Sequence, residues 1–177
     1  MRSILVGGLA AAIVMFALGF VFFGLLGMQA YDPLPPEVAA TIQAALGDSL
    51  AATGTYMVPA GEEEWMRGPG AVVNYVVAGG APAMPAAMII GFIHMAVTAM
   101  LMAVGLKAVG GDFQRQGKIV LWFGLAAAVF MHLGDPIWYG FAWRQSLFLF
   151  VADGVILIAG GLVLARWFTS QGGTGSA

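Results

Sequence analysis

Four long apolar stretches dominate the pattern of hydrophobic and polar positions along the chain. They cover residues 4–26, 85–106, 119–138 and 147–167. A helix of about 20 residues, rising 1.5 Å per residue, crosses the roughly 30 Å hydrocarbon core of a bilayer. Each stretch has about this length, so we predict four transmembrane helices. The first stretch has a signal peptide as its alternative, because Arg2 precedes it, but its apolar run exceeds the usual signal core of about 7–15 residues.

The composition agrees with a lipid environment. Hydrophobic residues make up 60% of the chain and charged residues only 9%, whereas soluble domains are about a quarter charged. The net charge of −2 argues against a nucleic-acid partner, which would require a basic face. The absence of cysteine excludes disulfides, iron–sulfur clusters and thiol chemistry. We therefore expect the lipid bilayer to be the main surroundings of the chain.

Charged residues predict the orientation of the helices. One side of the predicted membrane carries most of the basic residues: Arg2, Lys107, Arg115, Lys118 and Arg166. The other side carries most of the acidic residues. Because short cytoplasmic loops are enriched in lysine and arginine, both termini are expected in the cytoplasm, with residues 29–84 outside it. A bacterial-type inner (cell) membrane suits this multi-pass layout.

The segment between the first two helices, residues 29–84, is too long for a simple connection. Pro36 and Glu37 are typical of the first turn of a helix. Four apolar residues then recur every four positions and give that helix one apolar stripe: Val38, Ile42, Leu46 and Leu50. Gly54 is expected to terminate it.

Two short runs later in the same segment predict strands. They cover residues 55–58 and 71–77, and the residues 61–70 between them are expected to form an acidic loop. A lone two-stranded hairpin is marginally stable. We therefore expect it to pack on the preceding helix, on the membrane-embedded part of the protein, or on a partner.

Together these elements predict an all-α membrane protein, a four-helix transmembrane bundle with a small α+β extracytoplasmic cap between helices 1 and 2. The expected parts are helix 1 (residues 1–28), the cap (29–84), helices 2–4 (85–168) and a disordered cytoplasmic tail (169–177), which is rich in glycine and serine. Glycines on helix faces allow close helix packing, within the bundle or with a partner: Gly19, Gly24, Gly27, Gly160 and Gly161.

Three ionisable residues fall inside the predicted spans, at similar depths: His94, His132 and Asp153. Such residues are costly in lipid and commonly mark a functional site. The favoured interpretation is a structural hydrogen bond between helices that fixes their register. The alternatives are a haem b between His94 and His132, a transition-metal site formed by all three residues, and a proton relay or gated permease.

The turn between the third and fourth helices is predicted to lie at the membrane interface. Its residues are those expected at a lipid headgroup boundary: Asp135, Trp138, Tyr139, Trp143 and Arg144. Pro136 is expected to break the third helix. Arg144 is a candidate partner for Asp153 and, alternatively, a contact for a lipid phosphate.

No phosphate-binding, dinucleotide-binding or metalloprotease motif appears in the sequence, and no serine and histidine are placed as a nucleophile and its base. We therefore expect a non-enzymatic accessory or scaffold subunit without a cofactor. Its outer cap would bind a membrane-protein partner or a second copy of the chain. The alternative is a haem- or metal-binding redox or transport protein that uses His94, His132 and Asp153.

Overall fold

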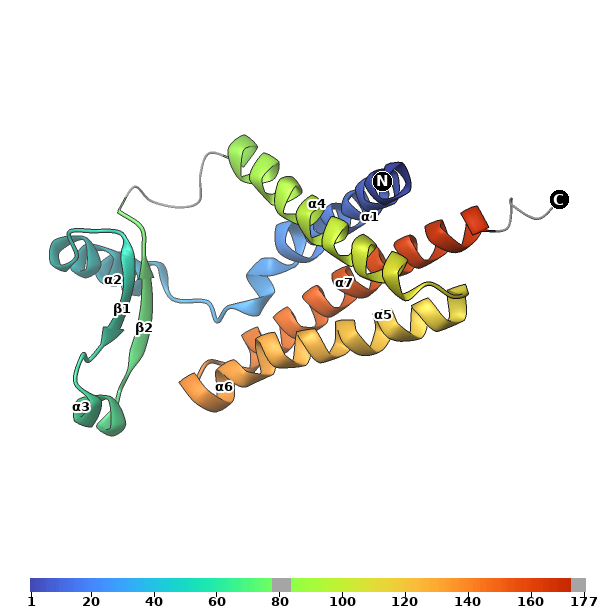
Figure 1. Cartoon of the computed structure of the whole chain (residues 1–177). Coiled ribbons are helices and arrows are strands. Elements are labelled where there is room, and N and C mark those ends of the chain that lie inside the picture. Colours follow the sequence, from blue (N-terminus) through green and yellow to red (C-terminus); the bar gives the residue numbers. More distant parts are fainter. Residues whose placement is uncertain (78–83, 173–177) are drawn as a thin grey trace. The chain divides into compact units, whose positions relative to one another are not determined.

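The structure, a computed structural model, describes residues 1–77 and 84–172 (Figure 1). The chain divides into two compact units. One unit joins Met1–Asp32 to Pro85–Ala177 and is called the bundle below. The other is Pro33–Met84 and is called the cap.

The bundle contains four long helical rods. Two of them are interrupted by a π-helical turn. The elements are α1 (Arg2–Gly19), η1 (Phe20–Leu25), η2 (Gly27–Ala30), α4 (Met84–Val109), α5 (Phe113–Ala128), η3 (Val129–Leu133), α6 (Gly134–Tyr139) and α7 (Trp143–Gly172). Four segments are long and apolar enough to cross a membrane: Arg2–Leu25, Pro85–Val109, Phe113–Tyr139 and Trp143–Ser170. The four helices of spanning length and apolarity that the sequence predicts are therefore confirmed, and they fit a multi-pass membrane protein.

The turn between α4 and α5 is set by short-range chemistry. Gly110 and Gly111 both have positive φ, which glycine adopts without steric cost. Asp112 then caps α5, because its carboxylate accepts a hydrogen bond of 2.8 Å from the backbone N–H of Arg115. The helix consequently begins at Phe113, earlier than the predicted residue 119, and includes Arg115 in its first turn.

Two boundaries near the other helix ends also differ from those expected. Pro136 does not break the third rod but lies in the first turn of α6, where backbone N–H groups have no intrahelical partner to lose. The rod ends at Tyr139, before Gly140 with its positive φ. The α7 helix includes residues 169–172, which the sequence placed in a disordered tail. Residues 173–177 of that tail lie outside the described residues.

The α7 helix occupies the middle of the bundle and packs against both α1 and α5. The α7 helix approaches α1 and α5 closely because it carries glycine, which has no Cβ, at both contacts. A Cβ added at Gly160 would lie 2.5 Å from Met15 Sδ, and one at Gly161 would lie 2.5 Å from Val120 Cγ1. The expected close packing at these two glycines is confirmed. The α4 helix contacts α1 through an edge-to-face pair of Phe16 and Phe92, with ring centroids 5.5 Å apart.

The core of the bundle combines alanines, which let helices approach closely in the absence of water, with larger apolar side chains. Its buried members are Ala11, Ala12, Met15, Ala99, Ala103, Leu106, Val120, Ile156 and Leu164. The sequence analysis missed three further close contacts made by glycines. They are Gly7 against Trp167, Gly8 against Met100, and Gly124 against Ile158.

The cap combines two helices with an antiparallel hairpin. Its elements are α2 (Pro36–Ser49), β1 (Gly54–Val58), α3 (Glu62–Arg67) and β2 (Ala71–Tyr75). The strands pair with Tyr56 opposite Val73 and Met57 opposite Val72, so the predicted hairpin is confirmed. The first helix ends at Ser49, because Leu50 is already extended, and Gly54 begins the strand instead of terminating the helix.

The expected acidic loop is wrong in part, because it contains the short helix α3. Gly61 precedes the helix, and three glutamates occupy its first turn, where the positive end of the helix dipole favours carboxylates. Gly68, with φ of 63°, closes the helix. The Trp65 ring then packs at Gly70, where an added Cβ would lie 2.9 Å from the ring.

The hairpin is held mainly by polar contacts. The hydroxyl of Thr55 donates to Asn74 Oδ1 at 2.8 Å, and the hydroxyl of Tyr56 donates to the Ala52 carbonyl at 2.8 Å. Despite these bonds, no residue from 33 to 77 is buried. The described part of the cap therefore lacks a hydrophobic core of its own.

Candidate functional site

His132 and Asp153 form the principal polar contact inside the bundle. His132 lies in η3 and Asp153 lies in α7, which pack against each other. His132 Nε2 is 2.7 Å from Asp153 Oδ2, and the two side chains are 10% and 26% exposed. An ionised carboxylate only accepts hydrogen bonds, so the imidazole N–H is the donor whenever Asp153 is charged.

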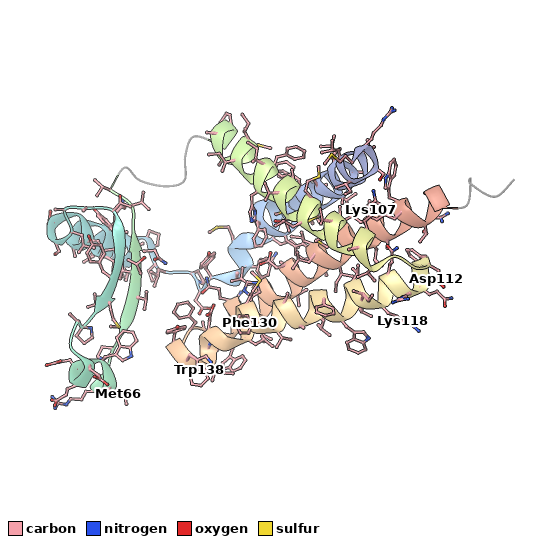
Figure 2. All side chains as sticks on the ribbon, viewed as in Figure 1. Met66, Lys107, Asp112, Lys118, Phe130 and Trp138 are labelled. Atoms are coloured by element: carbon pink, nitrogen blue, oxygen red, sulfur yellow. The ribbon has the colours of Figure 1, made fainter. Side chains whose placement is uncertain are left out.

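The π-helical turn η3 determines where the imidazole points. Val129, Phe130 and Met131 in this turn are exposed, whereas His132 is buried. Phe130, which is labelled in Figure 2, is 88% exposed. A π turn adds one residue to a helical turn and changes which side chains share a face, and such turns are frequent at functional sites. The local backbone thus directs the one polar side chain of η3 into the bundle.

The structure brings together two of the three ionisable residues that the sequence grouped. His94 lies on α4, and its side chain is exposed. Within residues 1–77 and 84–172, no three histidine, cysteine, aspartate or glutamate side chains come close enough to hold a metal ion. The three residues therefore do not form a metal site in this structure, in which His94 is exposed and His132 is buried.

Arg144 pairs with a residue that the sequence analysis did not consider. Its Nη1 lies 2.8 Å from Oδ1 of Asp32, which follows η2. Both side chains are more than half exposed. The suggested pairing of Arg144 with Asp153 is therefore wrong. Asp153 lies about two helical turns further along α7, where its carboxylate contacts His132 instead. The observed pair ties the end of the first rod to the start of α7.

The aromatic residues of the predicted interfacial turn are exposed. They are Trp138, Tyr139 and Trp143. Trp138, labelled in Figure 2, lies at the end of the third rod that is opposite to Lys118. Asp135 is half-buried, and its backbone carbonyl accepts a hydrogen bond from the N–H of Phe141. Exposed rings at a helix end fit the headgroup layer of a membrane.

Gln116 is a buried polar residue that the sequence analysis missed. It is 2% exposed, and its Nε2 donates to the Gly111 carbonyl at 3.2 Å. Its Oε1 has no hydrogen-bond partner among the described residues. An uncharged amide next to a basic turn gives little signal in a sequence, because glutamine is common on exposed helix ends. It anchors the start of α5 to the turn before it.

Fold and site together define a helical protein with four helices long and apolar enough to span a membrane, of which the third and fourth are joined by a histidine–aspartate hydrogen bond. Comparisons of the chain with protein-family models, with curated proteins and with solved structures gave no match.

Proposed function

We propose that this protein is a non-enzymatic accessory or scaffold subunit of a cell membrane, and that its cap binds a membrane-protein partner outside the cytoplasm. One observation supports the proposal most directly. The cap presents apolar side chains on defined secondary structure, while none of residues 33–77 is buried. Folded domains normally bury such side chains, at a gain of about 25 cal/mol per Å².

The exposed apolar residues of the cap lie on both its long helix and its hairpin. On α2, Val38 and Ile42 are one turn apart and share a face. On the hairpin, Met57 and Val72 are directly paired across the strands. These four side chains are 38–52% exposed. Exposed apolar patches on otherwise polar units commonly mark protein interfaces.

The polar pair inside the bundle agrees with a scaffold role. His132 and Asp153 satisfy each other, and a satisfied interhelical hydrogen bond holds two helices in register. A catalytic group would in addition need access to a substrate. The positions of the basic residues, which favour the cytoplasmic side, support an orientation with the cap outside the cytoplasm.

The proposal is tested by site-specific photo-crosslinking of the full chain in native membranes. A photoreactive amino acid at Ile42 is expected to give one discrete protein adduct. The same group at Ala44, which is exposed on the opposite side of α2, is expected to give little or none. Val72→Glu should abolish an adduct formed through Met57, because the two residues are paired across the strands, whereas Ala44→Glu should leave it intact.

The same experiment has clear contrary outcomes. If the probes at Ile42, Met57 and Val72 react only with lipid, the cap lies on the membrane surface, and the proposal fails. If they give no adduct with any other molecule, the proposal also fails. An adduct with twice the mass of the chain identifies the partner as a second copy.

A further inference from the structure

The imidazole of His94 lacks a partner on the surface of the bundle. Its side chain is exposed, and it takes part in no side-chain hydrogen bond or ion pair among residues 1–77 and 84–172. Thr98, one turn further along α4, donates to the backbone carbonyl of His94 at 3.0 Å and not to the ring. On a helix that spans a bilayer, an exposed side chain meets lipid or another protein instead of water. The ring therefore needs a hydrogen-bond partner from outside the described chain.

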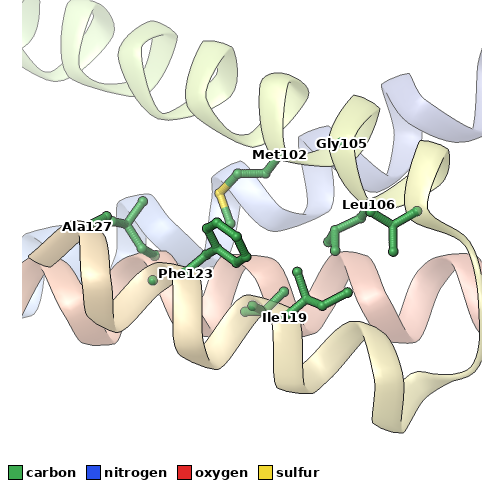
Figure 3. Close-up of a pocket in the computed structure, with 10 residues that line it drawn as sticks. Met102, Gly105, Leu106, Ile119, Phe123 and Ala127 are labelled. Carbon is green, nitrogen blue, oxygen red and sulfur yellow. The ribbon is translucent and has the colours of Figure 1, made fainter.

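The face of α4 opposite to His94 packs on the rest of the bundle. Ala99 and Ala103 on that face are fully buried. Figure 3 shows Met102 and Leu106 projecting from α4 toward α5. Because successive residues of a helix are rotated by about 100°, Ala103 lies about 180° around the helix axis from His94. The core of the bundle thus orients α4 so that His94 points directly outward.

His94 belongs to an exposed stripe whose members recur at alternating spacings of four and three residues. The stripe, called the α4 stripe below, consists of Ile90, His94, Val97, Leu101, Val104 and Ala108, and all six residues are exposed. At about 100° per residue, they lie within about 40° of one line along the helix. This is the heptad spacing by which two helices pack along a common seam. The apolar members would suit lipid equally well, so the partner of the stripe has to be identified from His94.

A second copy of α4 supplies the group that His94 lacks. A neutral imidazole carries one N–H donor and one unprotonated nitrogen that accepts, so two imidazoles can hydrogen-bond to each other. Two copies inserted in the same orientation place their His94 residues at the same depth. A two-fold axis along the membrane normal then brings the same stripe of both helices together. A helix from any other protein would have to carry a matching polar group at this depth.

We propose that this protein forms a parallel homodimer through the α4 stripe, with a hydrogen bond between the two His94 imidazoles in its seam. The apolar members of the stripe pack against their counterparts along the rest of the helix. A single polar residue in a heptad seam fixes the register and the number of helices that associate, and His94 has this role here. The dimer uses no residue of the cap, so it does not depend on the partner proposed for the cap.

Cysteine cross-linking of the full chain in native membranes tests the seam, because the chain has no cysteine of its own. Ile90→Cys, Val97→Cys and Val104→Cys should each give a disulfide-linked dimer on mild oxidation. Ile89→Cys is the matched control, because Ile89 and Ile90 are adjacent and 62% and 60% exposed, yet point about 100° apart. It should give little dimer. Equal cross-linking at the two isoleucines, or no dimer at any stripe position, would overturn the proposal.

A second measurement tests the role of His94. Energy transfer between donor-labelled and acceptor-labelled chains in vesicles, followed as lipid is added, gives the affinity of the dimer. His94→Leu should weaken it about threefold to twentyfold, which is the effect of losing one hydrogen bond between membrane helices.

Two further variants separate this hydrogen bond from a change in packing. His94→Asn should retain most of the affinity, because an amide also donates and accepts. Thr98→Val removes a hydroxyl that is bonded within α4, outside the stripe, and should have little effect. Equal affinities of His94→Leu and the original chain, or equal weakening by His94→Leu and His94→Asn, would contradict the hydrogen bond between the imidazoles.

Discussion

His132 and Asp153 are 21 positions apart in the sequence, yet their side chains meet at 2.7 Å between η3 and α7. The contact joins the third and fourth of the helices long enough to span a membrane, at a point where the third contains a π turn. In lipid, neither side chain can exchange this hydrogen bond for one with bulk water. The pair is therefore expected to contribute to both the stability and the register of the bundle.

A double-mutant cycle measures this contribution. Asp153→Ala should lower the free energy of unfolding by about 1–3 kcal/mol, because it leaves a buried imidazole without its partner. His132→Ala combined with Asp153→Ala should cost less than the sum of the two single changes, with a coupling energy of about 0.6–1.7 kcal/mol. Unfolding in mixed micelles by titration with a denaturing detergent gives these values. Strictly additive effects would show that the two side chains do not interact.

The contact between Gly161 and Val120 tests the close packing of α7 against α5. Gly161→Ala would place its methyl carbon about 2.5 Å from Val120 Cγ1, and the stiff β-branched valine cannot easily move away. We expect a loss of about 1–3 kcal/mol in unfolding free energy. Val120→Ala should restore most of it, and Gly105→Ala, which has open space, should cause no loss. A neutral Gly161→Ala would argue against this packing.

The ion pair between Arg144 and Asp32 should contribute little to stability. Both side chains are more than half exposed, and exposed ion pairs are typically worth about 0.2–1 kcal/mol. Arg144→Gln should therefore change the thermal midpoint in detergent only slightly, and the change should shrink as salt is added. A loss comparable to that of Asp153→Ala would contradict this expectation and would assign Arg144 a larger structural role.

The cap should not fold stably by itself. A peptide of residues 33–84 lacks buried residues in its described part, and isolated two-stranded hairpins are marginal in water. Its amide proton spectrum is expected to show narrow dispersion, and its circular dichroism should change gradually on heating. Well-dispersed resonances with a cooperative melting transition would show that the cap is self-sufficient, and would remove the main support for a partner.

The orientation can be tested cleanly because the chain contains no cysteine. In intact bacterial cells, a membrane-impermeant maleimide should label Glu63→Cys in the cap but not Gln114→Cys near the α4–α5 turn. Both positions are exposed, so neither should be protected by folding alone. Gln114→Cys should react after the membrane is permeabilised. The reverse pattern would place the cap in the cytoplasm.

Several elements could be predicted because their signals are local. The hairpin followed from two runs of β-favouring residues separated by glycines and prolines, and its strands pair as expected. The sequence does not predict the short helix α3, because a run of three glutamates is also typical of an acidic loop, although their place in a first turn favours a helix. Proline breaks a helix when it lies in the interior, whereas Pro136 follows the π turn η3 and lies in the first turn of α6.

The sequence by itself determined that four helices are long and apolar enough to cross a membrane, since length and hydrophobicity need no tertiary context. It also placed His94, His132 and Asp153 at similar depths, because depth follows from the rise per residue. Only the tertiary structure decided which of them meet. Rotation about each helix axis depends on packing and on the π turn at His132, and it leaves His94 exposed while His132 contacts Asp153.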